Sequence, residues 1–306
     1  MKDYHIHSIY SEDGQYTPAQ LVEQCASAGI TEMAIADHNT VRGVPEGLMA
    51  AEKAGIHIIP AIEIDCSLDQ TNLHILGYGI DIRRPEYDVI ENRIRNQCIH
   101  VSSERLKRMQ ELGFHISREE LVRAVENPWW PESWTGEMFA EVLLKKPGEA
   151  GNPALAPYRE GGNRSDNPYV NFYWDYCAQG KPAYVPWQYP DAAEIIEVIH
   201  QTGGKAVLAH PGNNLGDEKE MLWKIIGLGL DGIEAFSSYH RPEQSAFFRK
   251  VAEKAGLFVT YGSDYHGKTK PEVRLGGHGF FGDSQSILCN LQDKSVKKNI
   301  DQAKCH

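Results

Sequence analysis

The side chains of this chain that could do chemistry are histidines and carboxylates placed where short apolar runs end. His5 and His7 alternate along the first run. A strand repeats every two residues, so both imidazoles point to one face about 7 Å apart and can converge on one metal ion. Asp37–His38, His210–Pro211 and Asp264-x-His266 follow other apolar runs. Together these groups predict a metal site.

A second pattern pairs Glu63 with His74. Glu63 ends a predicted strand and His74 opens the next one. A hairpin centred near Leu68–Asp69 would place the two roughly opposite each other, with their Cβ atoms about 5 Å apart. Asp13, in the loop after the first strand, completes the set of side chains that could ligate a metal.

Each group also has a simpler explanation. His5 and His7 could be a chance H-x-H pair, and Asp37–His38 could be a helix cap. Glu63 and His74 could be an exposed cross-strand pair. His210–Pro211 could be a turn, and Asp264 with His266 could belong to a Gly-flanked loop. The coincidence of ligand-type residues at separate strand ends favours a metal site, because barrel enzymes place their chemistry at the carboxyl ends of their strands.

The elements that must position these residues alternate between strand and helix, as in β/α units. The predicted strands are Tyr4–His7, Glu32–Ala36, His57–Ile64, Leu73–Ile80, Lys205–Ala209, Asp231–Phe236 and Leu257–Tyr261. Helices are predicted between Thr17 and Ala28 and at Pro45–Ala54, Ala192–Gln201, Glu218–Ile226 and Glu243–Ala255. The two halves of this pattern therefore read as parts of one α/β barrel.

The segment 84–181 has a different character. It begins with a long predicted helix, Pro85–Leu112, and continues into a stretch rich in Trp, Pro, Gly and Asn. We expect an inserted, mainly helical cap subdomain between barrel segments 1–83 and 182–306. Its aromatic side chains could stack on a base or sugar, although core packing is favoured for most of them: Trp129, Trp130, Trp134, Phe172, Tyr173 and Trp174.

Composition narrows the classes of protein. The 306 residues carry 31 basic and 42 acidic side chains, a formal net charge of −11. This balance argues against long nucleic acids as partners, because their phosphates require clustered Lys and Arg. No run of about 18 apolar residues predicts a membrane span. Six scattered cysteines without a C-x-x-C pair predict reduced thiols in the cytoplasm.

The motifs HIHSIYSEDG, ADHNT, PAIEID, HILGYGID, LAHPG and GSDYHG resemble the polymerase-and-histidinol-phosphatase (PHP) family of metal-dependent phosphoesterases. They occur in the family's order over residues 1–83 and about 182–282. The resemblance implies the fold of that family, a distorted, seven-stranded (β/α)7 TIM-like barrel of the amidohydrolase superfamily.

The resemblance also implies a trinuclear metal centre. Its three ions would be held by His5, His7, Glu63 and Asp264, by Glu63, His74 and His210, and by Asp13, His38 and His266. Asp37 is expected outside the ligand set, where it would accept the other ring N–H of an imidazole. Imidazole and carboxylate ligands without thiolate favour zinc, manganese or iron, so two to three such divalent ions per chain are predicted.

The activity implied is hydrolysis of a phosphate ester, a monoester, diester or cyclic ester, of a small molecule such as a nucleotide or sugar phosphate. A hydroxide bridging two ions would attack phosphorus, and Asp264 would help to handle the proton of that water. An exonuclease acting on oligonucleotides is one alternative, and a non-catalytic metal-binding domain is another. The net charge opposes the first, and the complete ligand set opposes the second.

Basic side chains near these motifs are candidates for binding phosphate. They are Arg42, Lys268, Lys270, Arg274 and His240, and His240 could also protonate the leaving group. For each of them, a solvated loop charge is the alternative.

The sequence departs from the family pattern at two places. Asn39 stands where the family's D-H-D-T motif has Asp, which leaves the predicted ligand set unchanged. In the segment SWTGEMFAE, Glu137 and Glu141 would repel a second phosphate, which argues against a bisphosphate substrate.

Overall fold

The computed structural model describes residues 1–125, 127–216 and 218–282. Its contacts divide the chain into two compact units. One comprises Met1–Glu91 and the described residues from Tyr189 onward, and the other comprises Asn92–Gln188. Helix α3 (Pro85–Glu111) supplies residues to both units. The predicted use of the insertion as a cap stays a prediction.

The first unit is built on a seven-stranded sheet in which the strands follow one another in chain order. The strands are β1 (Lys2–Ile6), β2 (Glu32–Ile35), β3 (His57–Leu68), β4 (Thr71–Tyr78), β5 (Lys205–Leu208), β6 (Gly232–Ser237) and β7 (Phe258–Gly262). Neighbours are parallel except that β4 runs antiparallel to both β3 and β5. All the predicted strands are therefore present.

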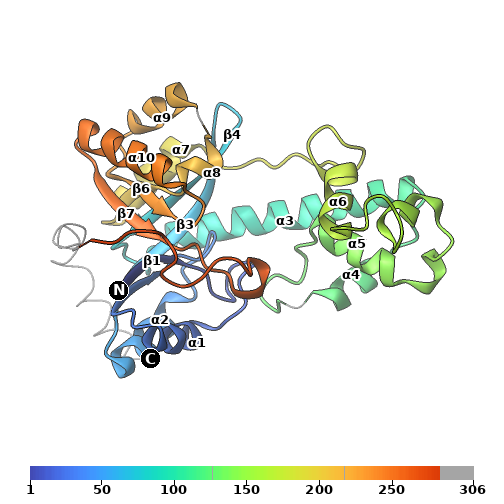
Figure 1. Cartoon of the computed structure of the whole chain (residues 1–306), viewed down its shortest axis with the longest axis horizontal. Coiled ribbons are helices and arrows are strands. Elements are labelled where there is room, and N and C mark those ends of the chain that lie inside the picture. The colour runs from blue at the N-terminus through green and yellow to red at the C-terminus, as the bar shows by residue number, and fades with distance from the viewer. Residues whose placement is uncertain (126, 217, 283–306) are drawn as a thin grey trace. The chain divides into compact units, whose positions relative to one another are not determined.

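The sheet closes on itself to form a nearly complete barrel. The amide of His7 donates to the carbonyl of Tyr265 at 2.9 Å, and the amide of Asp264 donates to the carbonyl of His5 at 2.8 Å. These bonds join β1 to the segment that follows β7 (Figure 1). The predicted seven-stranded barrel is confirmed, and its single reversed strand accounts for the distortion.

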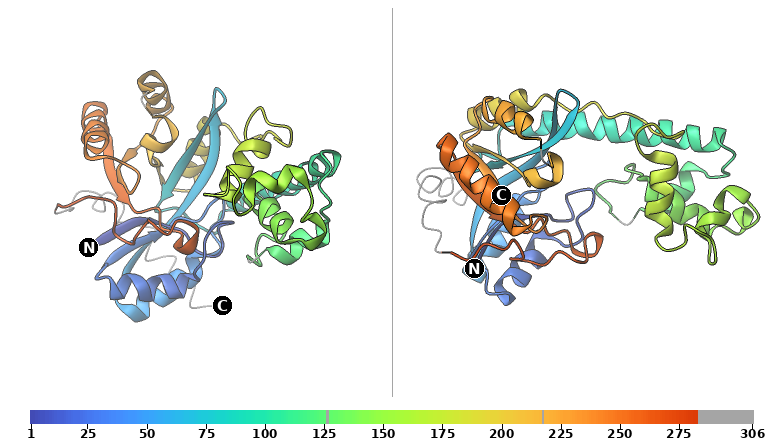
Figure 2. Two further views of the ribbon diagram at one scale, coloured as in Figure 1. Left: turned by 45° about the vertical axis from the view of Figure 1, so that its right-hand side comes forward. Right: turned by 45° about the horizontal axis from the view of Figure 1, so that its top comes forward.

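Helices cover the outside of the strands. They are α1 (Pro18–Ser27), α2 (Val44–Ala54), α7 (Ala192–Gln201), α9 (Lys219–Ile226) and α10 (Pro242–Ala255), while the short α8 (Pro211–Asn214) follows the end of β5. Figure 2 shows α1 and α2 on one side of the strands and α9 and α10 on another. Thr17 caps α1 through a reciprocal capping box with Gln20. Gly55 and Gly256 end α2 and α10 in the left-handed conformation that glycine adopts without strain.

The interior of the barrel is filled by alternating large and small side chains. Tyr4, Tyr78 and Tyr261 pack there against Ala34 and Ala61, and all five are buried. Because this apolar filling occupies the barrel, polar side chains at the carboxyl ends of the strands are left to form a site above it.

The second unit has its own helical core. It contains the remainder of α3 with α4 (Arg118–Ala124), α5 (Gly136–Lys145), α6 (Pro168–Phe172) and short turns between them. Trp134 and Phe172 are fully buried in this core, whereas Trp129 and Trp174 are 38% and 57% exposed. No helix among the described residues is both long and apolar enough to cross a membrane.

Candidate metal centre

The predicted ligands come together at one end of the barrel. They are supplied by the ends of β1, β2 and β5, by the segment after β7 and by the β3–β4 hairpin. Grouped by distance, their ligand atoms form sets that fall within 4.8 Å. These sets are His5, His7, Glu63 and Asp264; Glu63, His74 and His210; and His7, Asp13, His38 and His266. They coincide with the predicted groups, except that His7 joins the third as well.

Glu63 is the centre of this arrangement. Its carboxylate is fully buried and faces five imidazoles. Oε1 lies 2.9 Å from His74 Nδ1 and 3.0 Å from His210 Nε2, and Oε2 lies 3.0, 3.1 and 3.3 Å from His5 Nε2, His7 Nε2 and His38 Nδ1. The two oxygens of one side chain therefore serve two different sets.

The second carboxylate, Asp264, is shared by the two histidines of β1. Its Oδ1 lies 2.9 Å from His7 Nε2 and 3.3 Å from His5 Nε2. At the third set, Asp13 Oδ2 lies 3.1 Å from His266 Nε2. The His7 and His266 rings stack with centroids 3.9 Å apart, so the third set adjoins the first.

The residues present fit divalent metal ions. Seven atoms of the predicted ligands are buried without a hydrogen-bond partner among the described residues: His5 Nε2, His7 Nε2, Asp13 Oδ1, His38 Nδ1, Glu63 Oε2, Asp264 Oδ1 and His266 Nε2. Buried polar atoms are rarely left unsatisfied. Two ligand atoms about 2.1 Å from one ion lie about 3.0 Å apart at a right angle and about 3.4 Å apart in a tetrahedron. The observed separations of 2.9 to 3.3 Å match those values.

Burial and the pairing of carboxylates with imidazoles shift the pKa values in the cluster. Burial alone would lower the pKa of His5 and of His38, but Glu63 and the other carboxylates hold both well above the usual range. Burial alone would raise the pKa of Glu63, but His5, His38 and His74 hold it well below its usual range. Burial, followed by the neighbouring His266 and His38, lowers the pKa of His7 to about 4. The carboxylate is therefore ionised and the His7 ring neutral at pH 7, which are the forms that bind metal ions.

Groups outside the predicted set orient the imidazoles. Glu234 Oε1 lies 3.0 Å from His5 Nδ1, and its Oε2 accepts the backbone N–H of His210 at 2.8 Å. Asn214 Oδ1 lies 2.6 Å from His210 Nδ1. Partners of this kind fix the tautomer of a ligating histidine and raise its basicity. Glu234 could have been found from sequence, because it is the single charged residue of the buried strand GIEAFS.

Backbone strain is concentrated at the same place. Asn39, His210 and Asp264 have positive φ angles of 59°, 23° and 56°. Such conformations cost side-chain-bearing residues about 1–3 kcal/mol and persist where the surroundings enforce them, often at functional sites. Each of the three lies just after a barrel strand, so the strain accompanies the turn that aims a side chain into the cluster.

The hairpin register differs from the prediction. Residues Asp69 and Gln70 form its two-residue turn with positive φ angles, so Asp65, not Glu63, is directly opposite His74. Glu63 and His74 are diagonal neighbours on one face, which preserves their contact. The shift brings Asp65 to the cluster. Its position could have been suspected because residues 63 and 65 share one face of a strand.

Asp37 was predicted to accept a ring N–H of an imidazole, but the structure places its carboxylate against two serines. Its carboxylate accepts the backbone N–H and hydroxyl of Ser8 at 2.6 and 2.7 Å and the hydroxyl of Ser11 at 3.0 Å. The Ser11 hydroxyl lies 3.0 Å from His7 Nδ1. Asp37 therefore reaches the histidine only through Ser11, because the loop after β1 places that hydroxyl between them.

His240 also differs from its predicted role. Its Nδ1 lies 3.0 Å from the carbonyl oxygen of Ala235, and its Nε2 accepts the backbone N–H of Gly212 at 3.0 Å. Burial lowers the pKa of His240. Both ring nitrogens thus hold backbone groups, which favours a structural role for His240 over the predicted phosphate binding and proton donation.

The predicted cations differ in their surroundings. Lys270 Nζ lies 2.8 Å from Asp264 Oδ2. Arg42 Nε pairs with Glu91 at 2.7 Å. Lys268 and Arg274 are exposed. Sequence reasoning missed Tyr239, whose hydroxyl donates to the same Asp264 oxygen at 2.6 Å.

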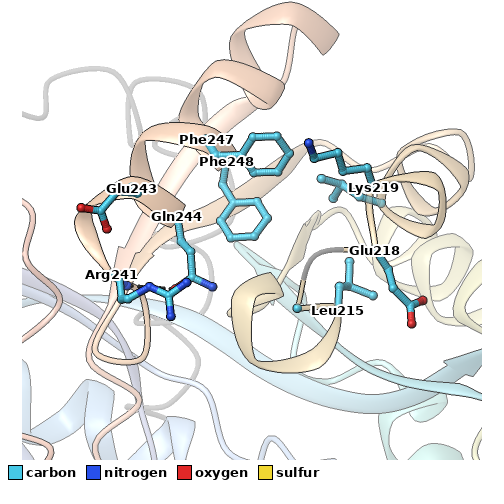
Figure 3. Close-up of a pocket in the computed structure, with 10 residues that line it drawn as sticks. Leu215, Glu218, Lys219, Arg241, Glu243, Gln244, Phe247 and Phe248 are labelled. Atoms are coloured by element: carbon cyan, nitrogen blue, oxygen red, sulfur yellow. Dashed lines mark hydrogen bonds between the residues drawn. The ribbon is translucent and has the colours of Figure 1, made fainter.

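A separate pocket of about 240 Å³ lies beside the barrel rim. Figure 3 shows Phe247 and Phe248 of α10 on one side of it and Leu215 and Lys219 on the other. None of the predicted metal ligands lines this pocket.

The fold and the cluster described above define the functional class, a metal-binding α/β barrel.

Comparison with known proteins gives the family. Residues 3–156 match the model of the PHP domain, which covers half of the chain. A phosphoribosyl 1,2-cyclic phosphate 1,2-diphosphodiesterase of Eggerthella lenta is 30% identical over 270 residues, which cover 88% of this chain and 95% of that protein. The chain belongs to the PHP domain family.

Two further relatives match over nearly the whole chain. The 5'-3' exoribonuclease Rnm of Escherichia coli is 29% identical over 282 residues, which cover 90% of this chain and 87% of the relative. A crystal structure of a protein described as a metal-dependent phosphoesterase of Bifidobacterium adolescentis superposes with a TM-score of 0.74 at 27% identity, covering 95% and 96% of the two chains. The predicted family is confirmed, and the predicted class of enzyme, a metal-dependent phosphoesterase, agrees with these relatives.

Proposed function

We propose that the chain hydrolyses a phosphate ester of a small molecule, such as a nucleotide or a sugar phosphate, with two to three divalent ions held by the predicted ligands. The single observation that carries the proposal is the convergence of buried, unpartnered ligand atoms around Glu63. Bound divalent ions would lower the pKa of water and neutralise charge on the phosphoryl oxygens. Zinc, manganese or iron suits a donor set of imidazoles and carboxylates.

Lys270 and Tyr239 are the groups proposed to bind the substrate. Both contact Asp264 Oδ2, and Lys270 Nζ lies 5.4 Å above the Tyr239 ring. The Lys270 side chain is 28% exposed, so its ammonium borders solvent as well as the cluster. An ammonium in this position can donate to a phosphoryl oxygen while Asp264 remains paired with the tyrosine. The part of Asp264 in handling the proton of the attacking water stays a prediction.

Two further expectations stay proposals. We infer a cytoplasmic location from thiol chemistry, because Cys25, Cys66 and Cys177 are buried free thiols, as is usual where thiols are kept reduced. We also infer that the inserted segment 84–181 selects the substrate, since it carries a core of its own.

Exonuclease activity on short RNA is the second candidate function. The observation that favours it is the similarity to the exoribonuclease of Escherichia coli over 90% of the chain. Both candidates break a phosphate ester, and they differ in the leaving group. The formal charge of −11 favours small substrates over long RNA, because long RNA requires a wide basic surface.

Steady-state kinetics on metal-loaded protein test the proposal. The substrates are p-nitrophenyl phosphate, nucleoside monophosphates, a cyclic nucleotide and a 5'-labelled oligoribonucleotide, each compared with chelator-treated protein. Metal-dependent release of phosphate or alcohol from the small esters supports the proposal. Shortening of the oligonucleotide without turnover of any small ester would establish the second candidate instead.

A lysine pair identifies the cation that binds the substrate. Lys270→Met is expected to raise KM about 10- to 100-fold, the equivalent of one hydrogen bond to a charged group. Lys53→Met, at an exposed position in the last turn of α2, serves as the control and is expected to change KM less than twofold. Equal effects of the two substitutions would remove Lys270 from the substrate site.

A further inference from the structure

One carboxylate of the cluster stands outside the predicted ligand set. Asp65 Oδ1 lies 3.3 Å from His38 Nδ1 and 3.4 Å from His74 Nε2. The three side chains offer ligand atoms within 4.8 Å of one another. Asp65 Oδ1 is buried and has no hydrogen-bond partner among the described residues.

We propose that Asp65 is a further metal ligand, on the side of the cluster formed by His38 and His74. The inference deepens the proposed function and rests on it. The two separations are those of ligands around one ion, about 3.0 to 3.4 Å. His74 faces Asp65 with Nε2 and Glu63 with Nδ1, so an ion held by Asp65 would be distinct from one that Glu63 and His74 Nδ1 hold. A carboxylate that only oriented the imidazoles would accept a hydrogen bond from a ring N–H, and neither contact has that geometry.

Asn39 holds Asp65 in this position. The Asn39 amide donates from Nδ2 to Asp65 Oδ2 at 2.9 Å, and its Oδ1 accepts the backbone N–H of Asp65 at 3.0 Å. Asn39 is buried, and its backbone has a φ of 59°. This double contact occupies one carboxylate oxygen and leaves the other facing the cluster. An aspartate at position 39 would instead place a like charge against Asp65 Oδ2.

The pairing of Asn39 with Asp65 gives the carboxylate two residues after Glu63 a function. Metal affinity in a site of imidazoles rises with each anionic ligand, because divalent ions are bound by charge as well as by geometry. Asp65 adds a fourth carboxylate to Glu63, Asp264 and Asp13. The Asn39 amide fixes its direction without adding a competing charge.

Metal binding by Asp65→Asn tests the inference. The Asn39 contact would hold the new amide oxygen, so that the NH₂ group, which cannot ligate, faces the cluster. We expect the number of ions per chain to fall, or one affinity measured by chelator competition to drop more than 100-fold. The visible absorption of the Co²⁺-loaded protein is also expected to change, because a ligand has been lost. Asp69→Asn, at the exposed turn of the same hairpin, is the control and should bind metal as the wild type does.

A second variant keeps the test decisive if Asp65→Asn does not fold. Asn39→Gly tolerates the positive φ and removes the clamp without touching the carboxylate, and we expect about 10-fold weaker metal binding. Unchanged ion number, affinity and Co²⁺ absorption in the folded variants would overturn the inference. Weaker binding with an unchanged Co²⁺ spectrum would also overturn it, because Asp65 would then only orient its neighbours. These readouts are independent of turnover, so a wild type that binds metal but cleaves no ester would count against the proposed function alone.

Discussion

Glu63→Gln is the substitution that probes the cluster most directly. The side chain keeps its shape and loses its charge, and each of its oxygens faces a different set of imidazoles at 2.9 to 3.3 Å. Removing one member of a buried charged set costs about 3–5 kcal/mol. At about 1.4 kcal/mol per tenfold change, the affinity for each ion that shares Glu63 should fall by roughly 100- to 4,000-fold.

The assay follows from linkage between metal binding and stability. Metal at 100 times its Kd stabilises the wild type by about 2.7 kcal/mol. A rise in Kd of 100-fold or more leaves about 0.4 kcal/mol or less at the same metal concentration. With about 2–4 °C per kcal/mol for a chain of this size, the metal-dependent rise in Tm should shrink from roughly 5–10 °C to about 1 °C. Elemental analysis after dialysis should show the matching loss of ions.

Glu32→Gln is the matched control for this experiment. Glu32 is also buried in the barrel, where it accepts the Tyr4 hydroxyl at 2.7 Å and pairs with Lys2 at 3.1 Å. It should lower Tm equally with and without metal, because it lies outside the cluster. Metal content and metal-dependent stabilisation in Glu63→Gln equal to those of the wild type would refute the reasoning.

Two further outcomes are expected. Gly262→Ala should lower Tm and metal content together, because a Cβ there would approach His5 Cβ to 2.2 Å. Such an overlap costs about 1–3 kcal/mol or more. A variant with the Tm and the ion content of the wild type would contradict the close packing of β7 on β1. His240→Leu should lower the free energy of unfolding by about 1–3 kcal/mol, because the backbone N–H of Gly212 loses its acceptor. Denaturant melts and kcat measured on the same preparation check this, and a large loss of kcat at unchanged stability would restore a direct catalytic role to His240.

The outcome at Lys270 shows what local sequence can and cannot predict about a binding site. Arg42, Lys268, Lys270 and Arg274 look alike as basic residues after ligand motifs, yet Lys270 contacts Asp264 of the cluster, whereas Arg42 pairs with Glu91. The Arg42 guanidinium forms an ion pair with Glu91, which lies far along the chain in the first turns of α3. A charged loop side chain has many partners within reach, and only the folded chain decides among them.

The sequence by itself determined the ligand cluster to a large extent. Ligand-type residues at the ends of separate strands must meet once the strands form one barrel, because parallel strands end at the same rim. The period of two along β1 put His5 and His7 on one face for the same reason. These are consequences of local periodicity, and local periodicity is what a sequence displays.

The tertiary structure alone decided the surroundings of the cluster. A hairpin turn displaced by one residue brought Asp65 opposite His74, and the pairing of β6 between β5 and β7 in the closed sheet brought Glu234 to His5 and His210. Positions of this kind depend on strand register and on contacts between residues far apart in the chain. A one-residue change in a turn alters them without changing the hydrophobic pattern, so no short stretch of sequence specifies them.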